Sequence, residues 1–139
     1  MTATNPIALA GLDHIVLRSA DPARLERFYV DVLGCTVEKR QPAFLLTQLR
    51  AGDALIDLVD ALALKLAVPE AAPGAARNLE HFCLRLKHWD AAAIVAHLRA
   101  HGIAPGEIRN RYGAEGEGPS LYFADPDGNT VELKAPARR

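Results

Sequence analysis

Alternation of apolar and polar positions defines a short strand that occurs twice in the chain. Residues 12–18 read LDHIVLR and residues 79–85 read LEHFCLR, so the same order of Leu, acid, His, two apolar residues, Leu and Arg recurs 67 positions later. Apolar residues then recur at helical spacing within 22–33 and within 91–101. Asp21 and Asp90 are N-cap candidates, and Gly34 and Gly102 follow as helix stops. Each copy therefore predicts a strand followed by a helix.

The two halves also end alike, each with an apolar strand that carries one acid. These strands lie at about 54–59 and 130–133, after turns of the Gly-Asp and Asp-Pro-Asp-Gly-Asn types. Two further short strands fit before each of them, at roughly 35–40 and 44–51 in the first half and 106–111 and 119–124 in the second. The pattern predicts an α+β fold of two βαβββ modules in a single domain, residues 1–139. Module 1 spans about 12–60, the linker 61–78 and module 2 about 79–135.

Composition narrows the function classes. The 139 residues include 16 Lys+Arg and 17 Asp+Glu, a formal charge of −1, and half of them are hydrophobic, as in globular proteins. This charge favours neither nucleic acid nor an anionic membrane as partner. No apolar run reaches the ~20 residues that span a bilayer, and the first 13 residues lack the features of a signal peptide. We therefore expect a cytoplasmic protein, with Cys35 and Cys83 reduced and half-buried.

Histidines and carboxylates stand at matching places in the two halves. His14 and His81 lie on the first strand of each half, and Asp57 and Glu132 lie on the last. A lone His on an apolar strand is more often a hydrogen-bonded core residue, and a strand carboxylate is usually solvated or paired. Four such residues at repeat-matched positions favour a joint role. Two imidazoles with one or two carboxylates suit a divalent transition metal and leave positions open for substrate.

The glycine-rich segment 109–120 is predicted to be a loop with binding residues. Arg109 and Arg111 are candidates for holding a carboxylate or phosphonate, and Tyr112 is the third candidate for substrate binding. The alternative is a solvated hairpin loop whose charges nearly cancel.

Three segments together resemble one known family: LDHIVLRSADPARLERFYVDVLG, NLEHFCLRL and GPSLYFADPDGNTVELK. They are similar to the vicinal oxygen chelate superfamily, which includes glyoxalase I, extradiol dioxygenases, fosfomycin-inactivating thiol transferases and bleomycin-resistance proteins. The resemblance covers residues 12–134 or so. It implies paired βαβββ modules whose strongly curved sheets enclose a metal-centred cavity, commonly in a homodimer.

The resemblance also implies roles for the four polar residues. His14, His81 and Glu132 match the superfamily's usual metal-binding triad, for one divalent ion per site: Ni, Zn, Mn, Fe or Co. Asp57 matches the place where glyoxalase I has a Glu, and it is one methylene shorter. Glu132 is the candidate base. Asp57 is a fourth ligand or second base, and a position outside the ligand sphere stays open for it.

Several activities remain open within that superfamily. The first is glyoxalase-like lyase or isomerase chemistry on a small oxygen-chelating substrate, through a metal-stabilised enediolate, with a thiol as co-substrate. The second is an extradiol-type dioxygenase with iron. A fosfomycin-type thiol transferase is the third: Glu117-Gly118 with Ser120 resembles its monovalent-cation loop, although Gly116 stands where a Ser is usual. The last is a non-catalytic antibiotic-binding protein, a class that typically lacks the triad retained here, so the metalloenzyme is favoured.

Overall fold

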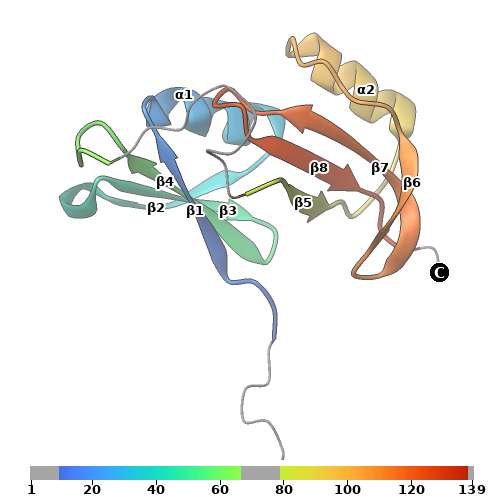
Figure 1. Cartoon of the computed structure of the whole chain (residues 1–139), viewed down its shortest axis with the longest axis horizontal. Helices are drawn as coiled ribbons and strands as arrows, with labels where there is room; N and C mark the ends of the chain where they lie inside the picture. Colours follow the sequence, from blue (N-terminus) through green and yellow to red (C-terminus); the bar gives the residue numbers. More distant parts are fainter. Residues whose placement is uncertain (1–9, 67–78, 138–139) are drawn as a thin grey trace, which may run out of the picture.

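The computed structural model describes residues 10–66 and 79–137, and these form two four-stranded mixed sheets with helices (Figure 1). The first sheet, in the order β1-β4-β3-β2, belongs to module 1, and the second, in the order β5-β8-β7-β6, belongs to module 2. In chain order the elements are β1 (His14–Ser19), α1 (Pro22–Arg27), η1 (Phe28–Val32), β2 (Thr36–Gln41), η2 (Pro42–Phe44), β3 (Leu46–Ala51), β4 (Ala54–Asp60), β5 (Phe82–Arg85), α2 (Ala91–Ala100), β6 (Arg109–Gly113), β7 (Gly116–Ala124) and β8 (Thr130–Lys134).

The α+β class and the repeated βαβββ order are confirmed. In both sheets the first strand pairs in parallel with the last, and the other pairings are antiparallel. The predicted N-caps are also correct, since the Asp21 and Asp90 side chains accept hydrogen bonds from the backbone N–H of Arg24 and Ala93. The helix of module 1 changes from an α-helix to a π-helical turn at Phe28. Residues 67–78 of the predicted linker lie outside the described residues.

The two strands predicted at 106–111 and 119–124 are present as β6 and β7, but the predicted loop over residues 109–120 is wrong, because most of it lies within these strands. These residues form most of a hairpin in which β6 and β7 pair directly, with Gly113 opposite Gly116. Gly116 adopts φ +105°, which permits the tight connection. Glycine inside a strand usually marks a place where another group approaches closely. That group is the Lys134 side chain, because a Cβ built on Gly113 would lie 2.6 Å from Lys134 Cε.

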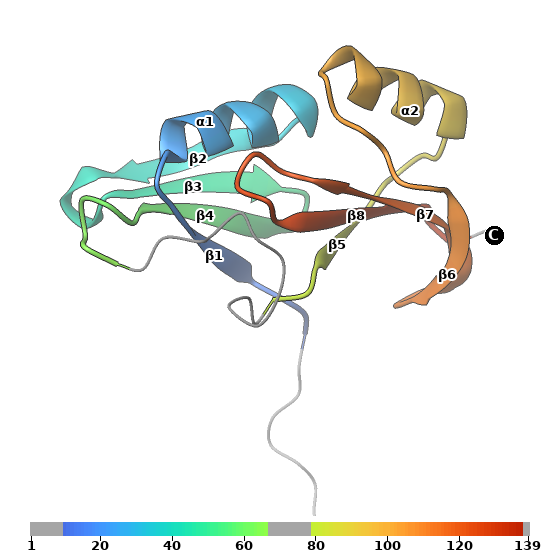
Figure 2. The same ribbon diagram turned by 45° about the horizontal axis from the view of Figure 1, so that its top comes forward.

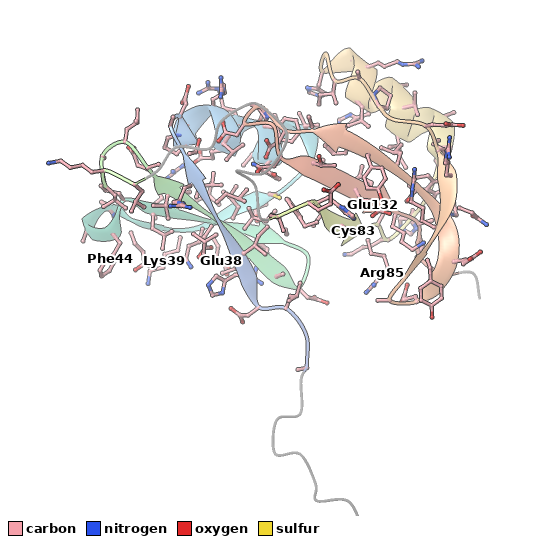
Figure 3. All side chains as sticks on the ribbon, viewed as in Figure 1. Glu38, Lys39, Phe44, Cys83, Arg85 and Glu132 are labelled. Carbon is pink, nitrogen blue, oxygen red and sulfur yellow. The ribbon has the colours of Figure 1, made fainter. Side chains whose placement is uncertain are left out.

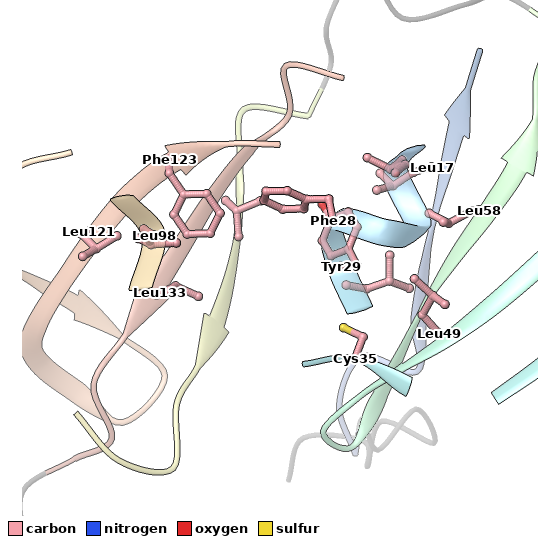
Figure 4. Packing of buried hydrophobic residues seen from close by; sticks show 13 residues of the cluster. Leu17, Phe28, Tyr29, Cys35, Leu49, Leu58, Leu98, Leu121, Phe123 and Leu133 are labelled. Carbon is pink, nitrogen blue, oxygen red and sulfur yellow. The ribbon is translucent and has the colours of Figure 1, made fainter. Parts of the chain in front are cut away.

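The core lies on the faces of the sheets that α1, η1 and α2 cover (Figure 4). Alternate strand residues point into it, so the intervening residues point to the opposite faces. The rings of Phe28 and Phe123, whose centroids are 6.1 Å apart, join the cores of the two modules. The remaining members of the buried cluster are Leu17, Leu25, Tyr29, Cys35, Leu49, Ile56, Leu58, Leu98, Leu121, Val131 and Leu133.

The buried carboxylate of Asp125, in the last turn of module 2, is hydrogen-bonded to Tyr29 in the helix of module 1. Asp125 accepts hydrogen bonds from Tyr29 Oη at 2.8 Å, from Asn129 Nδ2 at 2.8 Å, and from the backbone N–H of Asp127 and Asn129. Burial raises the pKa of Asp125, while these hydrogen bonds oppose that rise. Arg24 adds an ion pair with Asp127 at 2.9 Å. These contacts hold the two modules beside each other.

Removing the Tyr29 hydroxyl is expected to weaken this junction. Tyr29→Phe keeps the buried ring but deletes one donor to a carboxylate, and hydrogen bonds to charged groups contribute about 1.5–3 kcal/mol. We expect the free energy of unfolding, measured by urea titration, to fall by that amount. Tyr112→Phe is the matched control, because the Tyr112 side chain is 81% exposed and its change should stay within about 0.5 kcal/mol. Equal stability of the two variants would contradict a structural role for the Tyr29–Asp125 contact.

The helices leave one face of each sheet open. Figure 2 shows α1 and α2 on the same side of the molecule, above their respective sheets. The open faces therefore look in similar directions and do not close on each other into a barrel. In the part of the chain that the structure describes, neither helix has the length and apolar content needed to cross a bilayer.

Candidate metal centre

The open face of the first sheet carries one histidine and one carboxylate. His14 begins β1, and Val16, two residues on and on the same face, pairs with Asp57 of β4. This register brings His14 Nε2 to 4.0 Å from Asp57 Oδ2. The Asp57 side chain is 4% exposed and the His14 side chain 45%. A buried carboxylate and an accessible imidazole thus lie together on module 1.

A second carboxylate orients the His14 ring. His14 Nδ1 lies 2.7 Å from Asp13 Oδ2, and this hydrogen bond raises the pKa of His14. A neutral ring that donates through Nδ1 keeps the lone pair on Nε2, the atom nearer Asp57. Histidines that bind metals commonly donate their other ring N–H to a carboxylate in this way. Sequence reasoning missed Asp13, which stands beside the histidine in the chain.

Asp57 has an oxygen that the chain itself does not satisfy. Gln48 Nε2 donates to Asp57 Oδ2 at 3.3 Å, but Oδ1 is buried without a hydrogen-bond partner among the described residues. A buried, unpaired carboxylate oxygen is costly, and buried charges are normally paired or bound to a metal. The His14 and Asp57 donor atoms therefore fit the requirements of a cation.

Module 2 repeats the arrangement. Cys83 of β5 pairs with Glu132 of β8 in the register of Val16 with Asp57, and His81 lies just before β5. His81 Nε2 is 3.3 Å from Glu132 Oε1. Two donors that each bind an ion at about 2.1 Å, at an angle between a right angle and the tetrahedral angle, are separated by about 3.0–3.4 Å, so this spacing suits a shared metal. The Glu132 side chain is 7% exposed.

Two neighbours of Glu132 were not expected at the site. Tyr122 pairs with Glu132 across β7 and β8, and its ring packs edge-on against His81 with centroids 5.1 Å apart. Burial and the nearby Glu132 carboxylate raise the pKa of Tyr122. Figure 3 shows Cys83 beside Glu132 on the adjacent strand, and burial with that carboxylate raises the pKa of the Cys83 thiol to about 11. Cys35 is buried, whereas Cys83 as a whole residue is exposed although its thiol is partly desolvated, so the prediction of two half-buried cysteines is wrong.

The three candidates for substrate binding separate in the structure. Arg111 is half-buried, with its guanidinium carbon 4.4 Å from the centroid of the Tyr122 ring. Arg109 is exposed and pairs with Glu107 at 2.7 Å. Tyr112 is exposed and lies on the opposite face of β6 from Arg111. Among these three, Arg111 is the one adjacent to the module 2 pair.

The chain places its four candidate ligands in two pairs rather than in one cluster. Over residues 10–66 and 79–137, no group of three or more His, Cys, Asp and Glu side chains is placed to hold a metal ion. Two cavities of about 250 and 270 Å³ lie elsewhere, one between Pro22 and the ends of β2 and β3, the other between Trp89 and the start of β7. Neither cavity is lined by a candidate ligand. Each module thus carries one histidine–carboxylate pair on the open face of its sheet.

The described residues thus form two βαβββ modules, each with a histidine–carboxylate pair on its open sheet face. The model of the Glyoxalase/Bleomycin resistance protein/Dioxygenase superfamily matches residues 11–133. The chain belongs to this superfamily, as the sequence motifs indicated.

Solved structures with the same fold come from several bacteria. An integron cassette protein from the mobile metagenome of V. cholerae is 27% identical with a TM-score of 0.72, covering 94% of this chain and 98% of that one. An antibiotic binding protein from a Streptomyces species is 24% identical with a TM-score of 0.69, over 94% and 99%. A lactoylglutathione lyase from Agrobacterium tumefaciens is 21% identical with a TM-score of 0.64, over 94% and 96%. The last two likenesses establish the fold alone.

Proposed function

We propose that the protein is a divalent-metal-dependent enzyme of the glyoxalase-like class that acts on a small substrate with neighbouring oxygen atoms. The observation that carries this proposal is the pair of matched half-sites, each with one histidine and one buried carboxylate in the same strand register. The unpartnered oxygen of Asp57 supports it further. His14, His81 and Glu132 would hold the metal, and Asp57 would act as a fourth ligand.

The proposal includes a homodimer. The His14–Asp57 and His81–Glu132 pairs lie on separate sheets whose helices cover the same side of the molecule. A second copy related by a twofold axis can place the open face of its module 2 against the open face of module 1, and the reverse. Each dimer would then contain two complete sites, each made from two chains. This arrangement also covers both open faces.

The chain's own groups suit proton transfer next to a bound substrate. A divalent metal supplies Lewis-acid stabilisation of negative charge that develops on substrate oxygens. Glu132 is sheltered from water, and Tyr122 and Cys83 lie beside it on the two neighbouring strands. It is the candidate base that removes a proton from substrate carbon and returns it to the adjacent carbon. Tyr122 positions His81 through the edge contact of their rings.

Elemental analysis tests the proposal directly. The full chain is stripped with a chelator, incubated in turn with Ni²⁺, Zn²⁺, Mn²⁺ and Fe²⁺, and dialysed. We expect about one tightly held ion per chain for at least one metal, as three or four converging ligands provide. Methylglyoxal with a thiol is the first substrate pair to assay with that metal. No retained metal under any of these conditions would contradict the proposal and favour capture of a small molecule without chemistry.

A further inference from the structure

Two histidines stand together at the end of α2, away from the candidate metal centre. The ring centroids of His97 and His101 are 4.7 Å apart, with an angle of 62° between the ring planes. α2 covers the core face of the second sheet, whereas His81 and Glu132 lie on the open face of that sheet. The His97–His101 pair is therefore a separate cluster of metal-binding side chains, and the function proposed above does not use it.

The backbone of α2 fixes the spacing of this pair. Residues four apart are neighbours on one face of a helix. The backbone N–H of His101 lies 3.3 Å from the carbonyl oxygen of His97, so the last helical turn extends to His101. Leu98, between them, is 1% exposed and anchors this turn in the core. Both histidines are exposed. An ion from solvent can thus reach two rings that a fixed turn holds side by side.

A hydrogen bond to the other module orients the ring of His97. His97 Nε2 lies 2.7 Å from the carbonyl oxygen of Val32 in η1. A carbonyl oxygen only accepts, so Nε2 carries the proton and the neutral ring has its lone pair on Nδ1. Histidines that bind metals usually donate their other ring N–H to a carboxylate or a backbone carbonyl in this way. Among the described residues, no hydrogen bond uses Nδ1 of His97 or either ring nitrogen of His101.

The separation of the two rings matches a shared ion. An imidazole nitrogen binds an ion such as zinc at about 2.0–2.1 Å, and the ring centroid lies about 1.1 Å behind that nitrogen. Two rings that bind one ion at an angle between a right angle and the tetrahedral angle therefore have centroids about 4.4–5.2 Å apart. The observed 4.7 Å lies within this range. Two histidines four apart on a helix are also how an H-E-x-x-H helix holds zinc.

The surroundings of the pair favour a cation and limit how tightly it is held. The C-terminal end of a helix carries the negative end of the helix dipole, and α2 ends at this pair. Among the residues that the structure describes, no third His, Cys, Asp or Glu side chain is placed to complete a metal site. Water must then fill the remaining positions. Binding is therefore weaker than at a centre with three or four protein ligands.

We propose that His97 and His101 form a second divalent-metal site, which takes a transition-metal ion such as Zn²⁺, Ni²⁺ or Cu²⁺ and discriminates against Mg²⁺. Imidazole nitrogens suit the former ions, whereas Mg²⁺ requires oxygen ligands. Because water completes the coordination, this ion is exchangeable and is lost during dialysis that retains a tightly held one. The site does not depend on the function proposed above, so the two proposals can fail separately.

Titration of the metal-free full chain with Zn²⁺ tests this site, with the ring nitrogens of the histidines followed by ¹⁵N NMR. We expect the signals of His97 and His101 to change together along one saturable curve, with a coordination shift at His97 Nδ1. Mg²⁺ at the same ionic strength should change neither signal. His101→Ala should weaken Zn²⁺ binding at His97 by about tenfold or more, because loss of an outer contact of a metal ligand already costs about 10–100-fold.

Matched variants separate the pair from other histidines. His88→Ala removes an exposed histidine of the same module and should leave the Zn²⁺ affinity of the pair unchanged. His81→Ala should also leave it unchanged, which distinguishes this site from the candidate metal centre. Arg99→His combined with His101→Ala keeps two histidines on α2 but places them two residues apart, on different sides of the helix, and should not restore binding. Non-saturable shifts, equal affinities for the His101→Ala and His88→Ala variants, or recovery in the double variant would overturn the proposal.

Discussion

His81→Ala is expected to lower the bound divalent metal from about one ion per chain to none while the fold persists. His81 is half-exposed, precedes β5 and lies outside the buried core cluster, so its removal leaves no core cavity. Glu132 would then be the single remaining ligand on module 2. Loss of one of three or four ligands typically removes tight metal binding. Elemental analysis after dialysis measures the loss, and circular dichroism measures the retained secondary structure.

His88→Ala is the matched control for that experiment. His88 is an exposed histidine of the same module, seven residues further along the chain, and no described contact connects it with Glu132. Its variant should retain the metal content of the unmodified chain. Retention of metal by His81→Ala would show that the histidine is not a ligand.

The fold could be predicted from the sequence because the duplication repeats the same pattern of apolar and polar residues 67 positions later. The 67-residue offset between the two opening strands predicted that their partners would also match, and Asp57 and Glu132 do occupy the same register position in the two sheets. Alternation along each strand predicted that His14 shares a face with Val16, and the pairing of Val16 with Asp57 completes that half-site. The alternation along each strand and the internal repeat were together sufficient to predict the two-module fold and the matching positions of the histidines and carboxylates.

The β6–β7 hairpin of module 2 could not be predicted from alternation and repeat. Gly113, Gly116 and Gly118 lower strand propensity, so residues 109–120 indicated a loop. Gly116 supplies the positive φ of the turn, whereas Gly113 and Gly118 make room for the Lys134 side chain, which is 16 to 21 residues away and leaves no trace in local periodicity. Tyr122 was not among the predicted site residues. Its place beside Glu132 depends on the β7–β8 register, which a turn of five residues does not determine uniquely.

The two half-sites differ in a way that suggests divided roles. Glu132 lies among Tyr122, Cys83 and His81, groups that can donate hydrogen bonds to a carboxylate or bind a metal with it. Asp57 is deeper, shorter and left with an unpartnered oxygen. A carboxylate flanked by groups able to donate to it is suited to accept and return a proton, whereas one with an unpartnered buried oxygen is stabilised chiefly by a fixed cation. This contrast favours Glu132 as the base and Asp57 as a ligand.

Mixing two inactive variants is expected to restore metal binding if each site is shared between two chains. His14→Ala and His81→Ala should each bind no metal alone. In a dimer of one chain of each kind, one site lacks both histidines, but the other combines an intact module 1 with an intact module 2. Random exchange of an equal mixture makes about half of the dimers mixed, so about one quarter of an ion per chain should return.

Sites formed within one chain give the opposite result, because neither variant then contains a complete ligand set. A mixture of His14→Ala with Glu132→Ala should restore metal to the same extent, since these ligands also come from different modules. A mixture of His81→Ala with Glu132→Ala should restore none, because both lesions affect module 2 and every module 2 in the mixture is defective. Unfolding and refolding the variants together ensures exchange, and size-exclusion chromatography with light scattering establishes that dimers are present. Metal-free mixtures in all three combinations would exclude a site shared between chains.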